Sequence, residues 1–391
     1  MNLVEFVPPT PHPLWKLCPQ MGITDVIVKV NPDLTGLPDP WRYETLAKIV
    51  GRLKDAGLNV VGLEGDPFDM SPIKEYGIRV GENSSSWRKE EQNPLSNSNS
   101  KRQLIREGAL EHYRELLESM GKLGIKLLCY NFMVGKGWSR TGVREGRGGA
   151  KATYFSLRVG ENSSSWRKEE QIPPSNSNSK LQLNAEQVWA NYEYFIKAVM
   201  PTAAKCGVRM ALHPDDPCLP SLGGYARIFG SVEAYDRAYA LYPSPSNAIT
   251  FCQANFKLML GNGEWVTYPP SEASRRRRCP SRGGTGDGAT EELIKTIRHF
   301  GKRIAFIHVR DVEGTKEDFT ELFHDQGDTD QFALMRVYRE LGLDVPVRGD
   351  HVPEMAYDRE LTPEGTPGYF TLGRLFANGY LKALMKGTDN A

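Results

Sequence analysis

Several features that mark common protein classes are rare or missing in this sequence. No apolar run approaches the roughly 20 residues that a membrane-spanning helix needs. The N-terminal stretch has no basic segment followed by a long apolar one, so we expect no secretory signal. Acidic and basic side chains are nearly balanced, at 48 against 49, which gives no support for a nucleic-acid surface. The sequence has no P-loop, and no GxGxxG motif follows its first apolar segment.

Cysteine is also sparse. The six cysteines are scattered over 391 residues, and none forms a CxxC pair. Small secreted domains have much denser disulfide frameworks. We therefore expect reduced thiols and a cytoplasmic location. With 39% hydrophobic and 25% charged residues, the chain has enough apolar material for a large core.

One structural unit recurs along the chain: an amphipathic helix ends at a glycine, and a short apolar strand follows at once. The segment 46–53 has apolar residues at i, i+3, i+4 and i+7, which is one helix face. Gly57 then ends the helix, because glycine easily takes the left-handed conformation needed there. The same order of helix, glycine and strand returns at Gly124, Gly207, Gly301 and Gly342.

The apolar segments are spaced as in a protein of the α/β class. Continuous apolar strands that alternate with helices indicate a parallel sheet covered by helices. The eight candidate strands lie within 3–7, 25–30, 58–65, 125–132, 208–212, 248–252, 303–311 and 344–351. Eight such units predict a single (β/α)₈ TIM-barrel domain over residues 1–391. An open doubly wound sheet is the alternative, and the missing dinucleotide-binding motif disfavours it.

Three segments do not fit this rhythm. Residues 79–104 and 158–183 are nearly identical to each other and rich in serine, asparagine and charge, and residues 261–288 contain four consecutive arginines. Such compositions bury too little apolar surface to offset the entropy lost on ordering. We predict that all three are disordered or extraneous low-complexity insertions in βα loops. A pair of duplicated lid loops is the alternative for the first two.

Four expected strands end in residues that bind metals. In a parallel barrel, the active site lies at the C-terminal ends of the strands. The fifth to eighth strands end in His213, Cys252, His308 and Asp350. Each residue alone has an ordinary structural explanation, such as a buried thiol or a helix cap. Together, two imidazoles, a thiol and a carboxylate on successive strands suit a divalent transition metal.

Further polar residues follow the same strand ends and predict a small, polar, anionic substrate. Asn131 follows the fourth strand, Asp215 the fifth and Arg310 the seventh, and His324 lies further downstream. We expect these four residues to bind substrate. Arg310 is the candidate partner for a carboxylate, because its planar guanidinium can donate two parallel hydrogen bonds.

The motifs "CYNFM", "HPDDP", "FCQ", "HVRDVEGT", "FHD" and "DHVP" occur in this order. With them the chain resembles the mannonate dehydratase family, whose fold is a xylose-isomerase-like TIM barrel. The resemblance implies dehydration of D-mannonate to 2-dehydro-3-deoxy-D-gluconate in hexuronate and glucuronate catabolism, with Mn²⁺ or Fe²⁺. It places the metal ligands on the same four residues, His213, Cys252, His308 and Asp350. It also places acid and base roles on His351 and Tyr369.

Two other functions remain open from the sequence. One is a metal-dependent sugar isomerase or epimerase on the same barrel, although such sites usually rely on Glu and Asp ligands. The other is an inactive sugar-acid-binding pseudoenzyme disabled by the insertions. The sequence also leaves homo-oligomerisation open. Finally, Gly349 favours a turn after the eighth strand, and both Asp350 and His351 reach one pocket only if the strand has ended there.

Overall fold

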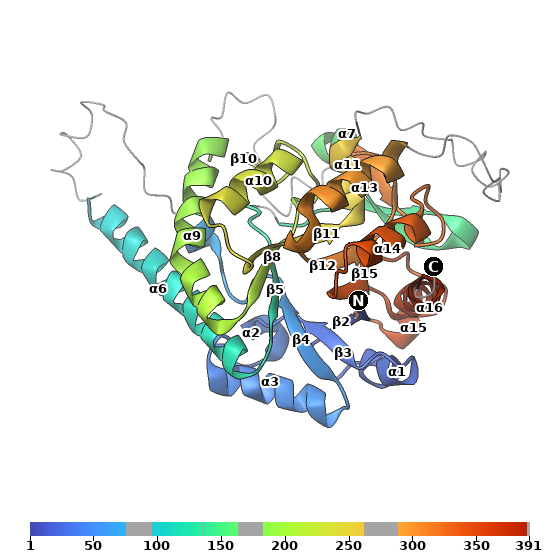
Figure 1. Cartoon of the computed structure of the whole chain (residues 1–391), viewed down its shortest axis with the longest axis horizontal. Helices are drawn as coiled ribbons and strands as arrows, with labels where there is room; N and C mark the ends of the chain where they lie inside the picture. The colour runs from blue at the N-terminus through green and yellow to red at the C-terminus, as the bar shows by residue number, and fades with distance from the viewer. Residues whose placement is uncertain (76–95, 136, 163–182, 262–287, 389–391) are drawn as a thin grey trace.

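The barrel is closed by the first strand of the chain. The computed structural model of this protein describes residues 1–75, 96–135, 137–162, 183–261 and 288–388. Within them, nine strands form one parallel sheet in the order β1-β15-β12-β11-β8-β5-β4-β3-β2. Only Val4 separates β1 from β2; β1 pairs with β15 and β2 with β3, so together they join both ends of the sheet (Figure 1). The predicted (β/α)₈ barrel is confirmed, and the open sheet is wrong.

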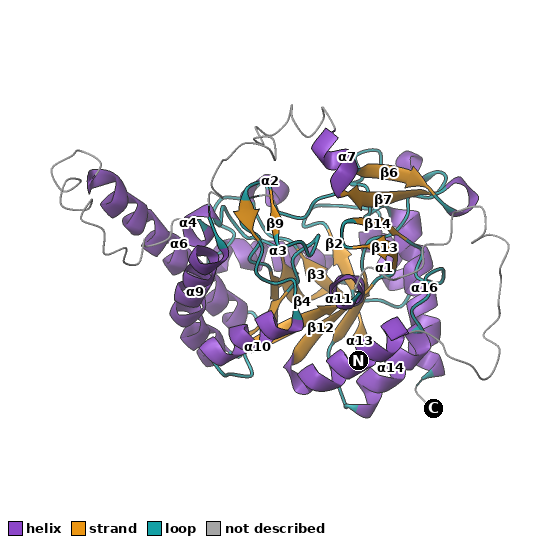
Figure 2. Ribbon diagram, turned by 90° about the horizontal axis from the view of Figure 1, so that it is seen from above, coloured by secondary structure: helices purple, strands orange, loops and turns teal. Residues whose placement is uncertain are grey.

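Each predicted strand is present. The strands of the barrel are β1 (Asn2–Leu3), β2 (Glu5–Val7), β3 (Asp25–Val28), β4 (Asn59–Glu64), β5 (Leu127–Tyr130), β8 (Arg209–Leu212), β11 (Asn247–Cys252), β12 (Ile304–Val309) and β15 (Pro346–Gly349). The helices that surround the barrel in Figures 1 and 2 are α1 (Leu14–Gln20), α3 (Tyr43–Asp55), α6 (Ser96–Lys122), α9 (Ala185–Cys206), α10 (Val232–Leu241), α13 (Gly288–Phe300), α14 (Gln331–Glu340) and α16 (Thr371–Gly387). No helix in these ranges is long and apolar enough to cross a membrane.

Local sequence signals explain where the helices begin and end. Helix α9 begins with a capping box, in which the Asn184 side chain accepts from the Gln187 backbone and the Gln187 side chain accepts from the Asn184 backbone. It ends at Gly207, whose φ of +68° lies in the left-handed region. The other four glycines predicted to end helices also have positive φ: Gly57, Gly124, Gly301 and Gly342.

Two apolar layers hold the barrel together. One lies between strands and helices, and the other fills the barrel interior with side chains such as Ile27, Leu127 and Phe306. Gly62 on β4 is part of this interior. A Cβ there would lie 2.8 Å from Ile27 Cδ1 and 3.0 Å from Leu127 Cβ, so only glycine fits.

A second, antiparallel sheet was not predicted. It has the strand order β13-β14-β7-β6 and is built from the segments that follow β5 and β12 (Figure 2). Its strands are β6 (Gly142–Glu145), β7 (Lys151–Ser156), β13 (Val312–Thr315) and β14 (Asp318–Glu321). The remaining short elements are α2 (Pro32–Thr35), α4 (Ser71–Lys74), α7 (Leu157–Asn162), α11 (Gln253–Leu260), α15 (Asp358–Leu361), the 3₁₀ turns Arg147–Gly149 and Gly301–Arg303, and the hairpin β9 (Ser221–Leu222) with β10 (Tyr225–Ala226).

The three predicted insertions lie mostly outside the described residues. Where they are described, they are partly helical: residues 96–104 belong to α6 and residues 158–162 to α7. That differs from the expected lack of regular structure, because helix propagation from a packed segment needs little apolar surface of its own. Along the chain, the three segments lie between β4 and the end of α6, between β5 and α9, and between β11 and α13, which are βα portions of the barrel.

A buried ion pair ties β2 to the last helix, α16. Glu5 on β2 accepts hydrogen bonds from Arg374 and Asn378 on α16, and the Arg374 Nε–Glu5 Oε1 distance is 3.1 Å. All three side chains are buried. Because a buried charge must be paired, this contact fastens α16 to the strand that closes the barrel.

Arg374→Met should lower the free energy of unfolding by about 3–5 kcal/mol, because it leaves the Glu5 carboxylate buried without its cation. Arg298→Met is the matched control: Arg298 pairs with Glu340 at 2.6 Å, but both side chains are about half exposed, and such pairs contribute about 0–1 kcal/mol. Urea unfolding of both variants measures the difference. Equal losses would contradict a special role for the buried pair.

Candidate metal centre and active site

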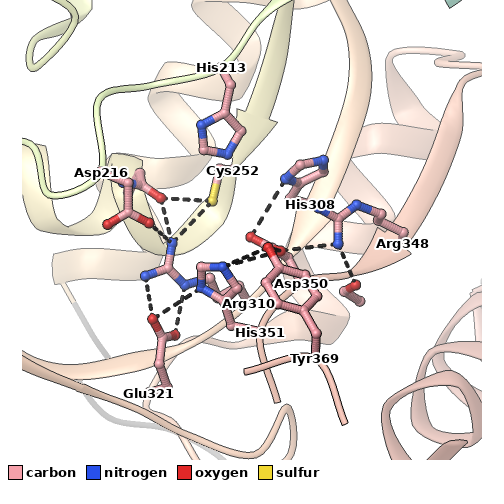
Figure 3. A network of polar contacts seen from close by, with 12 residues as sticks. His213, Asp216, Cys252, His308, Arg310, Glu321, Arg348, Asp350, His351 and Tyr369 are labelled. Carbon is pink, nitrogen blue, oxygen red and sulfur yellow. Dashed lines mark hydrogen bonds and ion pairs between the residues drawn. The ribbon is translucent and has the colours of Figure 1, made fainter. Parts of the chain in front are cut away.

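Four potential metal ligands converge at the C-terminal mouth of the barrel. His213 directly follows β8, Cys252 ends β11, His308 lies in β12 and Asp350 directly follows β15. These strands are neighbours in the sheet. One donor atom from each residue lies within 4.8 Å of all the others (Figure 3). The structure therefore brings together the four residues that the sequence singled out.

The free donor atoms fit a cation. His213 Nδ1 lies 2.8 Å from the Pro214 carbonyl oxygen, which can only accept, so Nδ1 carries the proton and Nε2 keeps its lone pair. His308 is completely buried, yet neither of its ring nitrogens has a hydrogen-bond partner. Leaving such an atom unpaired is costly, and a bound metal ion would satisfy it.

The electrostatics of the group also suit metal binding. Burial, followed by the charge of Arg348, lowers the pKa of His308 to about 4, so the imidazole is neutral. Burial opposes ionisation of Asp350, but the positive charge of His351 when it is protonated, and of Arg348 at all times, outweighs burial and holds the pKa of that carboxyl well below its usual value. Burial raises the pKa of the Cys252 thiol to about 12, although Arg310 opposes the rise. A cation that binds this sulfur must therefore displace its proton.

Arg348 and Glu64 support two of the four residues from inside the barrel. Arg348 Nη1 lies 3.0 Å from Asp350 Oδ1, and Arg348 donates two hydrogen bonds to Glu64. Glu64 Oε2 lies 3.7 Å from His308 Nε2. Sequence reasoning missed both residues. The available signal was position, since Glu64 ends β4 and Arg348 is two residues before Asp350, on the same side of the strand.

His351 and Tyr369, the two predicted catalytic residues, lie beside the group of potential ligands. Strand β15 ends at Gly349 and His351 has a φ of +42°, so the chain does turn where the sequence suggested. A left-handed conformation is strained for histidine, and such strain is concentrated at functional sites. His351 Nε2 lies 2.9 Å from the Tyr369 hydroxyl, which lies 3.3 Å from Asp350 Oδ1. The Trp138 ring packs against His351 at a centroid distance of 5.1 Å.

Arg310 reaches the site, but its guanidinium group is already hydrogen-bonded to other side chains of the protein. Its guanidinium donates to Glu321 at 2.6 and 2.7 Å, to Asp216 at 2.9 Å and to Asn255 at 2.6 Å. Its Nη1 also lies 3.7 Å from Cys252 Sγ. The predicted role as a substrate-carboxylate partner does not fit these contacts, because few donors remain. They favour a role in positioning neighbouring acids.

The other three predicted substrate-binding residues are likewise held by protein partners. Asn131 accepts from Lys74 Nζ and from its own loop backbone, both at 3.1 Å. His324 Nε2 lies 2.8 Å from the Val309 carbonyl oxygen, which accepts its proton.

Asp215 and Asp216 are adjacent in the chain but bind different partners. Asp215 accepts from the Phe229 backbone at 2.8 Å and pairs with Arg227. Asp216 instead accepts from Arg140 and from Arg310 (Figure 3). Sequence reasoning could not separate two adjacent aspartates. Arg140 comes from the segment before β6, which carried no signal at all.

The sequence is similar to a known protein family. The sequence model of the family described as D-mannonate dehydratase (UxuA) matches residues 50–263 and 279–391. Its gap falls inside the predicted insertion 261–288. A mannonate dehydratase of Brachyspira hyodysenteriae is 27% identical over 94% of this chain and 92% of its own length. One from Streptococcus suis is 29% identical over 88% and 84%.

Solved structures show the same fold. The crystal structure of mannonate dehydratase from Streptococcus suis serotype 2 has a TM-score of 0.70 at 22% identity and covers 100% of this chain and 95% of its own. A D-tagatose 3-epimerase-like protein has a TM-score of 0.52 at 10% identity, with 100% and 99% covered. At these identities the likeness concerns the fold alone. The match to the family's sequence model extends over most of the chain, and the chain therefore belongs to the mannonate dehydratase family.

Proposed function

We propose that this protein is a hydro-lyase that converts D-mannonate to 2-dehydro-3-deoxy-D-gluconate and water. Membership of the family supports the reaction. The observation that carries the proposal is the pairing of two features: a group of four potential metal ligands, and a His351–Tyr369 pair that touches it through Asp350. A carbon–oxygen lyase needs both electrophilic assistance and proton transfer.

We further propose that His213, Cys252, His308 and Asp350 hold one divalent cation, Mn²⁺ or Fe²⁺. Two imidazoles, a carboxylate and a thiolate are suitable ligands for such an ion. When bound, the cation supplies Lewis-acid stabilisation of the negative charge that develops next to the substrate carboxylate.

His351 and Tyr369 are proposed to move the protons. Dehydration removes the proton at C2 and expels the 3-hydroxyl group, so one residue must accept a proton and another must donate one. The 2.9 Å contact between His351 Nε2 and the Tyr369 hydroxyl shows that both polar atoms reach the same point. Trp138 and Arg140 both contact His351, Trp138 through its ring and Arg140 through Nη2, which lies 3.2 Å from His351 Nδ1.

A role in hexuronate catabolism follows from the proposed reaction. We also propose a cytoplasmic location, supported by the cysteines. The described cysteines are all free thiols, and four of them are buried: Cys18, Cys129, Cys218 and Cys252. Free thiols persist in reducing compartments.

The full chain, loaded with Mn²⁺, should form 2-dehydro-3-deoxy-D-gluconate from D-mannonate, and chelation should abolish the reaction. Product formation is measured by chromatography, with sugar isomerase and epimerase substrates tested in parallel. Turnover of those substrates without mannonate dehydration would favour an isomerase or epimerase. Metal and mannonate binding without turnover would identify an inactive sugar-acid-binding protein. Either result would contradict the proposed reaction.

Cys252→Ser should lose most of its bound metal, because a serine hydroxyl stays protonated where a thiol binds as thiolate. Cys129→Ser is the matched control. Cys129 is also a buried barrel cysteine, but it belongs with Glu64 and His308 to a different group of potential ligands. Metal content after dialysis is the measurement. Metal lost from Cys129→Ser and kept by Cys252→Ser would move the site to that other group.

His351→Asn should keep the metal and lose turnover by roughly 10²–10⁴-fold, the usual contribution of one general acid or base. His308→Asn should lose metal and activity together. Metal stoichiometry and turnover on D-mannonate are measured for both variants. If His351→Asn also loses the metal, His351 is a ligand. If it keeps near-normal turnover, the residue is structural.

A further inference from the structure

Nδ1 of His351 lies between a group that only accepts hydrogen bonds and a group that only donates them. Nδ1 lies 3.1 Å from Glu321 Oε1 and 3.2 Å from Arg140 Nη2. An ionised carboxylate can only accept a hydrogen bond, and a guanidinium can only donate one. Whether Nδ1 carries a proton therefore depends on which neighbour it binds.

The hydrogen bonds of Arg140 indicate that Nδ1 binds Glu321 and not Arg140. Arg140 Nη2 has two protons, and it lies 3.0 Å from Asp216 Oδ2 and 2.6 Å from Glu321 Oε1. Both protons therefore point at carboxylate oxygens, and none is left for His351. Without a proton on Nδ1, its lone pair would face the lone pairs of Glu321.

Glu321 is held in the ionised form. It accepts from Arg310 through both carboxylate oxygens, at 2.6 and 2.7 Å, and also from Arg140. Burial alone would raise its pKa, but the two guanidinium groups outweigh burial and lower the pKa to about 2. Glu321 is therefore an acceptor throughout the neutral range.

We propose that Glu321 is a positioning residue that fixes the tautomer of His351: Nδ1 carries the proton and donates it to Glu321, so the lone pair of the neutral imidazole is on Nε2. The Tyr369 hydroxyl has one proton and two acceptors within reach, and His351 Nε2 at 2.9 Å is nearer than Asp350 Oδ1 at 3.3 Å. This inference rests on the proposed function and adds to it, because it specifies which atom accepts the proton. A carboxylate that orients an imidazole in this way is a common device for preparing a base.

The proton transfers then balance. His351 Nε2 takes the C2 proton, and the electron pair of the broken C–H bond forms the C2–C3 double bond. The 3-hydroxyl leaves with the proton of the Tyr369 hydroxyl as water, and the resulting enol tautomerises to the 2-keto product. The proton on Nε2 returns to the Tyr369 oxygen across their 2.9 Å contact, which restores both residues.

Asp216 provides an internal control. It is as buried as Glu321 and binds the same two arginines, Arg140 at 2.7 and 3.0 Å and Arg310 at 2.9 Å. Its hydrogen bonds go to these arginines, whereas Glu321 also contacts His351 (Figure 3). Removing the charge of either acid perturbs the same pair of arginines. Only the change at Glu321 also removes a partner of the His351 imidazole.

The test combines histidine ¹⁵N NMR with kinetics on the full-length protein. Spectra are recorded on Zn²⁺-loaded protein, which is diamagnetic, and the His351 signals are assigned with His351→Asn. Wild type should show a protonated Nδ1 and an unprotonated Nε2. Glu321→Gln should lose this preference and reduce kcat by roughly 10²–10⁴-fold with little change in KM or metal content. Asp216→Asn should keep the tautomer, and its loss of kcat should be at least tenfold smaller than the loss in Glu321→Gln.

A protonated Nε2 in the wild-type spectrum would overturn the proposal, whatever the variants do. The proposal would also be overturned if Glu321→Gln and Asp216→Asn lost kcat equally and the His351 tautomer were unchanged in both. If the variants do not fold, the wild-type spectrum alone decides. Wild-type protein with the expected tautomer but no mannonate dehydration would instead contradict the proposed function and support the assignment of Glu321.

Discussion

Two imidazoles, a thiol and a carboxylate meet at the mouth of the barrel, and the rest of the site depends on this convergence. The parallel barrel makes it possible, because the C-terminal ends of β8, β11, β12 and β15 lie side by side. A completely buried histidine without a hydrogen-bond partner is unfavourable in a folded protein. A cation bound by all four side chains, as proposed above, would remove that penalty and would couple metal binding to the shape of the site.

Each acid around this centre is paired with one or two buried arginines. Asp350 and Glu64 share Arg348, while Asp216 and Glu321 share Arg140 and Arg310. Buried acids without such partners would take up protons and lose their function as ligands or acceptors. The arginines therefore keep the carboxylates ionised near the metal centre, and in the proposed mechanism this state also orients His351.

The barrel and its four converging side chains were predictable from the sequence, because both depend on local order. Helix, glycine and strand follow each other along the chain, and a residue at the end of a parallel strand must lie at the mouth. The sequence did not predict which partner each charged side chain would bind. Asp215 and Asp216 are adjacent and alike, yet they bind different partners.

The contacts between distant segments were also beyond sequence reasoning. Arg310 was expected to bind substrate, but Glu321 and Asp216 already engage its donors. Glu321 belongs to an antiparallel sheet and Arg140 adjoins it, and the short strands of this sheet did not stand out in the sequence. Their pairing brings together residues 181 positions apart, and only the folded chain shows it.

The most direct test of this account is an anomalous-scattering map from crystals of the protein grown with Mn²⁺. We expect one peak per chain, bonded to Cys252 Sγ, to a nitrogen of His213, to a nitrogen of His308 and to the Asp350 carboxylate. A peak held by Glu64 and Cys129 instead, or no peak at the barrel mouth, would contradict the central claim that these four side chains form the metal site.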